Sequence, residues 1–238
     1  MSKKVLVTGA SRGIGFAVAE AFARNGYTVF ATYHNTKNTL TKLSDRLDAE
    51  GYTLIPVSCD VSSEESVNAM FSEIGEVDIL INNAGIAQFK LLSDITCEDW
   101  DSILNVNLKS VFLCSKAASF GMIRNRFGRI INISSVWGVV GASCESHYSA
   151  SKAGIIGLTR ALAKELGPSG ITVNCIAPGV IRTEMNAHLS DEDIRVLCEE
   201  TPLGRIGEPE EIAQAALFFA TADFVTGETL SVGGGFGM

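Results

Sequence analysis

The feature that most constrains this chain is a regular alternation of short β-branched runs with longer helical patterns. Residues 4–9 (KVLVTG), 28–33 (TVFATY) and 53–60 (TLIPVSCD) are predicted strands, and a helical pattern follows each of them. The same rhythm continues through strand patterns at 77–85, 128–135, 170–179 and 228–235. Such alternation is typical of parallel βαβ units. We therefore expect a Rossmann-type, doubly wound parallel α/β sheet of about seven strands with helices on both faces.

The helical patterns set the domain organisation. The two longest cover residues 97–126 and 148–167, and the second ends at Gly167-Pro168, a helix stop signal. The stretch 179–205 is predicted to be irregular and to form a substrate lid, because long loops beyond a strand's carboxyl end often cover a ligand cleft. No shift in composition marks a linker, so residues 1–238 are expected to form a single domain for both dinucleotide binding and catalysis.

Composition excludes several function classes. A net charge of -8 argues against nucleic acid as the main partner and disfavours an anionic membrane surface. Six cysteines without a C-x-x-C pair indicate reduced thiols rather than a disulfide or zinc framework, and no metal site is expected. The chain shows neither a secretory signal nor an apolar run long enough to span a membrane. We expect a cytoplasmic protein.

The stretch Gly9-Ala10-Ser11-Arg12-Gly13 fits two motifs. As G-x-S-x-G it is a hydrolase nucleophile elbow with Ser11 as the attacking hydroxyl. As G-x-x-x-G-x-G, ending at Gly15, it is a loop that lets dinucleotide phosphates approach the backbone at a helix N-terminus. A hydrolase needs a histidine oriented by a carboxylate. The three histidines offer no obvious pair of this kind, so the dinucleotide interpretation is favoured; they are His34, His147 and His188.

Tyr148 and Lys152 are four residues apart at the start of a predicted helix and therefore share a face. The pattern is short, and a solvated helix face is the alternative explanation. If the ammonium lies close to the phenol, it favours the phenolate and lowers the pKa of Tyr148 from its usual value of about 10. A tyrosine of this kind can donate a proton to a forming alkoxide.

The cofactor preference is predicted from the absence of an acidic residue near the end of the second strand. NAD-specific sites place Asp or Glu about 20 residues after the glycines, where it binds the ribose 2′-hydroxyl. Residues 21–44 contain no acidic residue, and the second strand ends in Tyr33 and His34. Arg12 in the glycine loop would attract a 2′-phosphate. We predict NADP(H) as the cofactor.

Beyond these patterns, the chain resembles the short-chain dehydrogenase/reductase family from end to end. After T-G-x-x-x-G-x-G (8–15), the family's marks appear in order as CDV (59–61), NNAG (82–85), NVNL (105–108), ISS (133–135), YSASK (148–152) and PG (178–179). The stretches GRIINISSVWG and PLGRIGEPEEIA are similar to sequence motifs of the 3-oxoacyl-[acyl-carrier-protein] reductases. The resemblance implies NADPH-dependent reduction of a 3-oxoacyl to a 3-hydroxyacyl group on acyl carrier protein, in fatty acid biosynthesis.

The resemblance also implies a catalytic tetrad of Asn107, Ser135, Tyr148 and Lys152. Ser135 would hold the substrate carbonyl oxygen, Asn107 would hold a water next to Lys152, and Lys152 would bind the nicotinamide ribose. The predicted cofactor-binding residues are Gly9, Ser11, Arg12, Gly13, Ile14, Gly15, Tyr33, His34, Asp60, Val61, Asn83, Ala84, Gly85, Tyr148, Lys152, Pro178, Gly179, Ile181 and Thr183.

The residues at the mouth of the predicted cleft do not decide which ketone is the substrate. Glu145 stands where those reductases usually carry Gln, with Cys144 beside it, and both are candidate substrate contacts. An acidic carrier protein would need a local basic patch, for which Arg124, Arg126 and Arg129 are candidates.

Three alternatives to the fatty-acid reaction stay open. A carboxylate at the cleft mouth suits a cationic ketone. The pattern SSxWG…GASCE…Y also resembles the sequence of a relative that reduces an aminopentanone group on elongation factor P. Another carbonyl reductase of the family, or a sensor that binds NADPH without catalysis, is also considered. The intact tetrad speaks against a sensor. The resemblance further implies a homotetramer built through the long helices, about 97–122 and 148–167, and the last strand.

Overall fold

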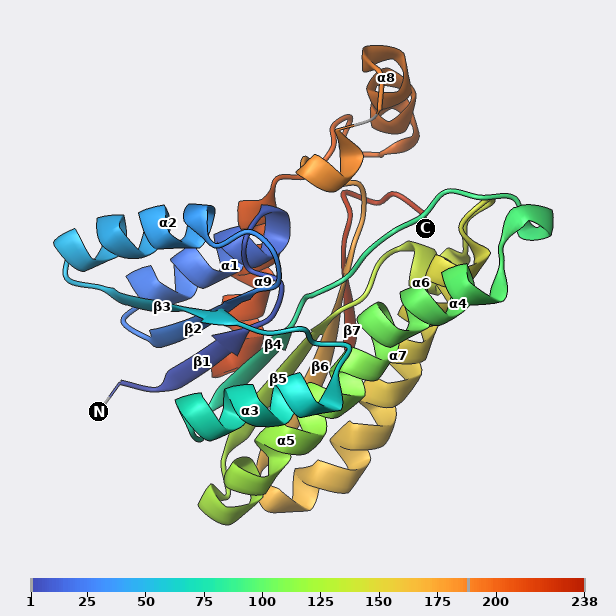
Figure 1. Cartoon of the computed structure of the whole chain (residues 1–238). Helices are drawn as coiled ribbons and strands as arrows, with labels where there is room; N and C mark the ends of the chain where they lie inside the picture. Colours follow the sequence, from blue (N-terminus) through green and yellow to red (C-terminus); the bar gives the residue numbers. More distant parts are fainter. Residues whose placement is uncertain (1, 188, 238) are drawn as a thin grey trace.

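In the computed structural model, residues 2–187 and 189–237 are described, and within them seven strands form one parallel sheet in the order β3-β2-β1-β4-β5-β6-β7 (Figure 1). This confirms the predicted doubly wound α/β sheet. Each strand is shorter than or equal to its sequence pattern, because the polar ends of the patterns form the loops at the sheet edge. The strands are β1 (Lys4–Val7), β2 (Thr28–Tyr33), β3 (Thr53–Ser58), β4 (Ile79–Asn82), β5 (Gly128–Ile133), β6 (Ile171–Pro178) and β7 (Thr229–Val232).

Helices cover both faces of the sheet. One face carries α1 (Gly13–Arg24), α2 (Asn38–Ala49) and α9 (Pro209–Thr221), and the other carries α3 (Glu64–Ile74), α5 (Ser110–Asn125) and α7 (Ser146–Leu166). Successive side chains of β1 point to opposite faces of the sheet. Val5 packs in the same cluster as Phe22 of α1, whereas Leu6 packs with Leu113 of α5. A sheet buried on both sides explains why its strands are continuously apolar.

The direction of winding reverses between β1 and β4, which are neighbours in the sheet. From β1 the chain moves outward through β2 to β3, then crosses back to β4 and continues to β7. The loops after β1 and β4 therefore leave the sheet in opposite directions and open a crevice at the carboxyl ends of the strands. The glycine loop follows β1 at this point, and the segment 83–96 follows β4.

The helical pattern predicted over 97–126 is interrupted by a wider turn. It consists of α4 (Cys97–Leu104), a π-helical turn η2 (Asn105–Lys109) and α5. Single π turns inside α-helices are often found at functional sites. The remaining short elements are η1 (Leu92–Asp94), α6 (Trp137–Val140), η3 (Gly167–Ser169) and η4 (Glu184–Asn186).

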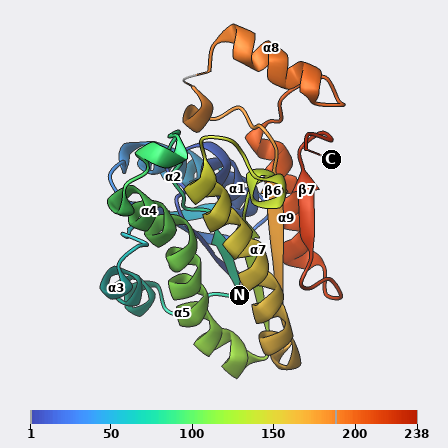
Figure 2. The same cartoon turned by 90° about the vertical axis from the view of Figure 1, so that its right-hand side faces the viewer.

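The stretch 179–205, predicted to be irregular, contains a helix, so that part of the prediction is wrong. Helix α8 (Asp191–Glu200) begins at a capping box in which Ser190 and Asp193 bond each other's backbone N–H groups. Arg195 adds ion pairs to Glu192 and Glu199 on the same helix. These local contacts stabilise a helix without a buried face. Figures 1 and 2 both show α8 standing away from the sheet, beyond the crevice. Its role as a lid stays a prediction.

None of the helices in the described residues is long and apolar enough to cross a membrane.

Candidate active site

A cleft of about 930 Å³ opens at the carboxyl ends of the strands. The residues that line it come from the loops after β1 to β6. They include nearly all of the residues that the sequence predicts for cofactor and catalysis. These lining residues are Gly9, Ser11, Arg12, Gly13, Ile14, Gly15, His34, Asp60, Val61, Asn83, Ala84, Gly85, Ser135, Glu145, Tyr148, Lys152, Pro178, Gly179, Ile181 and Thr183.

The glycine loop is shaped by close contacts with the loop after β4. Gly9 has a φ of +63°, and a Cβ there would lie only 2.7 Å from Cα of Ala84. Gly13 has a φ of +54° and starts α1, so its backbone also needs glycine. The loop leaves the N-terminus of a three-turn helix facing the cleft, an arrangement that suits phosphate. These residues fit a dinucleotide, whose pyrophosphate would lie against this loop.

Thr8 and Asn83 join the two loops. The hydroxyl of Thr8 accepts hydrogen bonds from the backbone N–H groups of Asn83 (2.9 Å) and Ala84 (3.1 Å). The amide of Asn83 donates in return to the carbonyl oxygens of Thr8 (2.9 Å) and Gly9 (3.0 Å). The T-G and NNAG motifs are thus two halves of one structure, which holds the crevice at a fixed width.

The other end of the cofactor cradle is polar and carries a cation. Arg12 precedes α1 and lines the cleft together with His34, Asn35 and Thr36 from the loop after β2. The nearby carboxylate of Asp60 is already engaged, since it accepts hydrogen bonds from the backbone and the hydroxyl of Ser62 (2.9 and 2.7 Å). These bonds, the hydroxyl first, lower the pKa of Asp60.

The predicted catalytic residues converge at the opposite end of the cleft. Lys152 is buried, and its ammonium donates to the carbonyl oxygen of Ile133 (3.0 Å) at the end of β5. The same Nζ lies 5.6 Å from the centroid of the Tyr148 ring. Ser135 follows β5 two residues later, and its hydroxyl accepts a hydrogen bond from the backbone N–H of Trp137 (3.2 Å).

Asn107 lies in the π turn and holds the segment after β4. Its amide forms two hydrogen bonds with the backbone of Ile86, accepting from the N–H (2.8 Å) and donating to the carbonyl (2.9 Å). It also donates to Ser151 (3.1 Å), whose hydroxyl bonds the carbonyl of Tyr148 (2.7 Å). A Cβ on Gly85 would lie within 3.5 Å of both Asn107 Oδ1 and Lys152 Nζ, so Asn107 and Lys152 face the same glycine.

The predicted lowering of the Tyr148 pKa is wrong for this structure. Burial raises the pKa of Tyr148 to about 12; a hydrogen bond with Ser135 opposes this, and the charge of Glu145 adds to it. Burial also lowers the pKa of Lys152 to about 8. The reason is that both groups are removed from water, while the ammonium is bonded to a carbonyl of β5 rather than to the phenol oxygen.

Besides Asn107, two predicted contacts lie outside the cleft lining. Tyr33 ends β2 and packs against the core cluster beneath α1 and α2. Cys144 sits on the rim with a left-handed backbone (φ 62°), its thiol 3.6 Å from the hydroxyl of Ser143, while Glu145 does line the cleft. His188, one of the histidines weighed for a hydrolase, lies outside the described residues.

The predicted basic patch is wrong as a docking surface for an acidic carrier protein. Arg124 pairs with Glu76, Arg126 donates to the carbonyl of Pro168 (3.2 Å), and Arg129 is buried and pairs with Asp223. All three lie where α5 ends and β5 begins, whereas the cleft is at the other end of that strand. Spacing in the sequence could not show this, because it does not say at which end of the sheet a loop lies.

The substrate end is lined by apolar side chains that sequence reasoning missed. Phe89 comes from the segment after β4, Val136 and Trp137 follow β5, and Met185 and Leu197 come from the region of η4 and α8. Val136 and Trp137 lie in the SSVWG pattern without a predicted role, and no motif marks Phe89, Met185 or Leu197, because these side chains meet only through loop conformations. Among the described residues, no group of three or more His, Cys, Asp or Glu side chains is arranged to bind a metal ion.

Replacement of Lys152 by Met should increase the free energy of unfolding at neutral pH. Below pH 8 the lysine is charged in both states, and a pKa lowered from 10.5 to about 8 corresponds to about 3 kcal/mol against folding. Loss of the hydrogen bond to Ile133 destabilises the variant by about 1 kcal/mol, so the free energy of unfolding increases by about 2 kcal/mol in total. Between pH 8 and 10.5 the unfolded chain binds the proton and folded Lys152 does not, so wild-type stability rises and the advantage shrinks.

Urea unfolding across this pH range measures the effect, with the exposed Lys42→Met as the control. A difference that stays constant with pH, or a Lys152→Met variant less stable than wild type at neutral pH, would contradict this account of the buried ammonium.

Comparisons with known proteins agree with this geometry. A family model described as "Enoyl-(Acyl carrier protein) reductase" matches residues 9–237. The 3-oxoacyl-[acyl-carrier-protein] reductase FabG of Escherichia coli (strain K12) is 46% identical over 236 residues, which cover 98% of this chain and 96% of the relative.

Solved structures show the same fold. A crystal structure of a 3-oxoacyl-[acyl-carrier protein] reductase from Brucella melitensis has a TM-score of 0.94 at 36% identity, covering 99% of this chain and 91% of that one. A second structure of such a reductase from this organism, with bound NAD, has a TM-score of 0.93 at 36% identity and the same coverage. With a glycine cradle, a buried lysine beside a tyrosine and relatives of this similarity along nearly its full length, the chain belongs to the short-chain dehydrogenase/reductase family.

Proposed function

We propose that the protein is an NADPH-dependent ketoreductase that reduces 3-oxoacyl-[acyl-carrier-protein] to 3-hydroxyacyl-[acyl-carrier-protein]. The observation that carries the proposal is the convergence of Ser135, Tyr148 and Lys152 at one end of a cleft whose other end is a glycine cradle. The similarity to reductases named for this reaction supports the choice of ketone. The apolar residues of the substrate end, such as Phe89 and Val136, suit an acyl chain.

Residues of the protein can donate the proton that the reduction needs and stabilise the negative charge that develops on the carbonyl oxygen. A bound nicotinamide would supply the hydride. Ser135 would hold the carbonyl oxygen, and Tyr148 would give its proton to that oxygen as it becomes an alkoxide. A phenol with a pKa of about 12 stays protonated at neutral pH and is still a stronger acid than the alcohol formed. Lys152 lies close enough to stabilise the phenolate left behind.

The choice of NADPH rests on the charges around the end of β2. Arg12 lines the cleft beside His34, Asn35 and Thr36, and no acidic residue occurs between positions 21 and 44. A 2′-phosphate placed there would meet a guanidinium and several hydrogen-bond donors. Arginine binds phosphate well because its planar fork can donate two parallel hydrogen bonds.

The homotetramer and the cytoplasmic location stay proposals. The exposed face of α5 supports self-association, since Phe112, Phe120 and Ile123 lie on it and are 49%, 69% and 44% exposed. Apolar side chains gathered on one helix face are typical of a protein contact surface.

Replacement of Tyr148 by Phe should lower ketone turnover by about 100-fold or more, because the proton donor is lost. The measurement is the loss of NADPH absorbance with a 3-oxoacyl thioester, for wild type and variant side by side. NADPH binding, followed by its fluorescence, should be retained. Turnover that survives in Tyr148→Phe would refute this tyrosine as the proton donor.

Replacement of Arg12 by Ala should weaken NADPH binding by about 10-fold or more and leave NADH binding nearly unchanged, since only NADPH carries the 2′-phosphate. Dissociation constants for both cofactors measure this, and Lys37→Ala, at the start of α2, is a matched loss of one cation. An unchanged ratio of the two constants in Arg12→Ala would overturn this assignment.

A second candidate function is favoured by one observation. Glu145 lines the cleft and its charge acts on Tyr148, so a carboxylate lies beside the proposed proton donor. A carboxylate there attracts a ketone with an ammonium group, such as the aminopentanone group on elongation factor P, and does nothing for a neutral acyl thioester.

The substitution Glu145→Gln separates the two candidates. If the substrate is cationic, the variant should lose about 10-fold or more in kcat/KM for an amino ketone, because the attraction between opposite charges is removed. Its turnover of a neutral 3-oxoacyl thioester should stay the same. A large gain on the thioester and no loss on the amino ketone would instead favour the fatty-acid reaction.

A further inference from the structure

His147 directly precedes Tyr148 at the start of α7 and points away from the cleft. Its side chain is fully buried and is absent from the cleft lining. Its Nε2 lies 3.0 Å from Oε1 of Gln88, in the segment that follows β4. The residue next to the proposed proton donor is therefore bound to a different part of the chain from the one that faces the substrate.

The directions of the hydrogen bonds follow from Asp99. Gln88 Nε2 lies 2.8 Å from Oδ1 of Asp99, and an ionised carboxylate can only accept, so the amide NH2 of Gln88 faces Asp99. The amide oxygen then faces His147, whose Nε2 must carry a proton. The other ring nitrogen, Nδ1, is buried without a hydrogen-bond partner among the described residues. Within residues 2–187 and 189–237, the Nε2–H of His147 thus has one acceptor, the amide oxygen of Gln88.

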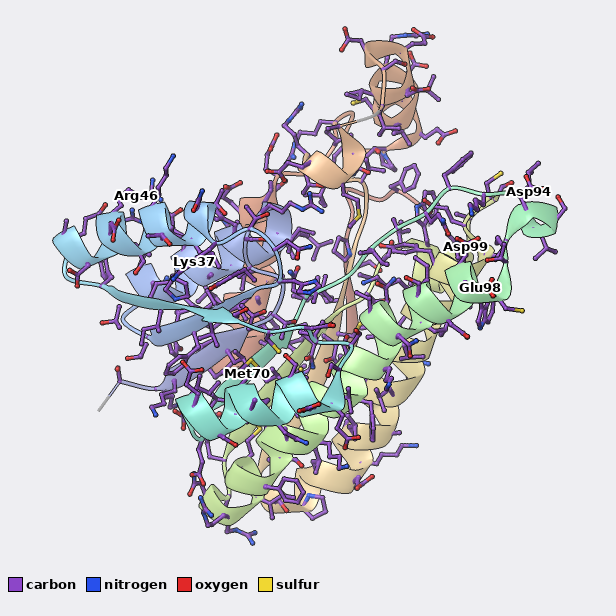
Figure 3. The ribbon with its side chains drawn as sticks, in the orientation of Figure 1. Lys37, Arg46, Met70, Asp94, Glu98 and Asp99 are labelled. Carbon is purple, nitrogen blue, oxygen red and sulfur yellow. The ribbon has the colours of Figure 1, made fainter. Side chains whose placement is uncertain are left out.

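Asp99 is held firmly at the first turn of α4, where Figure 3 labels it beside Glu98. Its carboxylate accepts from the ammonium of Lys90 (2.6 Å) and from the backbone N–H of Thr96 (3.0 Å) in addition to Gln88. Lys90, then Thr96 and Gln88, keep the pKa of Asp99 well below its usual range. The contacts that run from His147 through Gln88 therefore end at the carboxylate of Asp99, which its other hydrogen bonds hold in place.

The same segment makes a second contact with the approach to α7. The backbone N–H of Lys90 donates to the carbonyl of Cys144 (2.8 Å), whose φ of 62° is in the left-handed region that non-glycine residues rarely adopt. Two residues before Lys90, Gln88 binds His147. A backbone bond and a side-chain bond thus join the segment 86–96 to the residues just before Tyr148, while Asn107 holds that segment at Ile86.

From this we infer that Gln88 and Asp99 are positioning residues: the chain Asp99–Gln88–His147 fixes the first turn of α7 so that the Tyr148 hydroxyl points into the cleft beside Ser135. The inference rests on the proposed function, since it takes Tyr148 as the proton donor. Without Gln88, a buried N–H of His147 loses the one acceptor that it has in the described part of the chain, and the first turn of α7 must shift to satisfy it. A shift of about 1 Å in a reacting group can reduce a rate by about 100-fold.

The unpartnered Nδ1 of His147 allows a sharp test. The amide nitrogen of a glutamine side chain reaches the place of Nε2, whereas that of an asparagine reaches the place of Nδ1. His147→Gln should therefore restore the contact with Gln88, and His147→Asn should not. The variants to compare are Gln88→Ala, His147→Asn and His147→Gln, with Ser93→Ala as the control, because Ser93 is in the same segment and its hydroxyl bonds Asp94 alone among the residues that the structure describes.

We expect Gln88→Ala and His147→Asn to lower kcat by about 10-fold or more with little change in KM or in NADPH affinity. His147→Gln and Ser93→Ala should stay near wild type. Hydrogen exchange gives a readout without substrate. The amides of the first hydrogen-bonded turn of α7, from Ser149 onward, should exchange faster in Gln88→Ala and His147→Asn only.

The outcomes separate this inference from the proposed function. If Tyr148→Phe abolishes turnover but Gln88→Ala keeps both kcat and the protection of α7, the positioning chain is refuted and the ketoreductase stands. Equal losses in His147→Gln and His147→Asn would also refute it. If wild type reduces no ketone, the ketoreductase proposal fails, and the exchange rates alone decide whether Gln88 holds the start of α7.

Discussion

The buried ammonium of Lys152 is the constraint on which the rest of this site depends. A charge removed from water needs acceptors and space, and here the carbonyl of Ile133 is an acceptor at the end of β5. Glycine is required at Gly138, because a Cβ there would lie 2.7 Å from the backbone carbonyl carbon of Lys152 and 2.9 Å from its Cβ. The backbone of α6 therefore approaches α7 closely at Lys152.

Burial also explains why Tyr148 and Lys152 depart from their ordinary pKa values in opposite senses. Low polarity disfavours the charged form of each group, so the phenol holds its proton more tightly and the ammonium holds its proton less tightly. The spacing of the two residues in the sequence suggests only their proximity, which alone would favour the phenolate. The depth of the site decides the balance, and it favours a tyrosine that begins the reaction protonated, as reduction of a ketone requires.

Much of the fold could be predicted because its signals are local. Each strand is a short apolar run, and the carboxyl ends of parallel strands meet at one edge, so the residues that follow β1, β4, β5 and β6 meet at the cleft. The π turn at Asn107 and the cleft wall formed by Phe89 and Trp137 depend on tertiary contacts and could not be found this way, whereas α8 begins at a capping box, which is a local signal. Gln88 carries no motif, and its partners in α4 and α7 lie 11 and 59 residues away along the chain.

The distribution of charge along the cleft is a stronger guide to the substrate than the net charge of the chain. Arg12 lies at the cofactor end, where the carboxylate of Asp60 is engaged by Ser62, and Glu145 lies at the substrate end with the buried ammonium of Lys152. The arginines once considered for carrier-protein binding are paired with Glu76 and Asp223 or bound to a carbonyl at the far edge of the sheet. A carrier protein would therefore approach a rim that carries the negative charge of Glu145 beside Tyr148. An acidic carrier would need cations on that rim, whereas the charge of Glu145 would attract a cationic ketone.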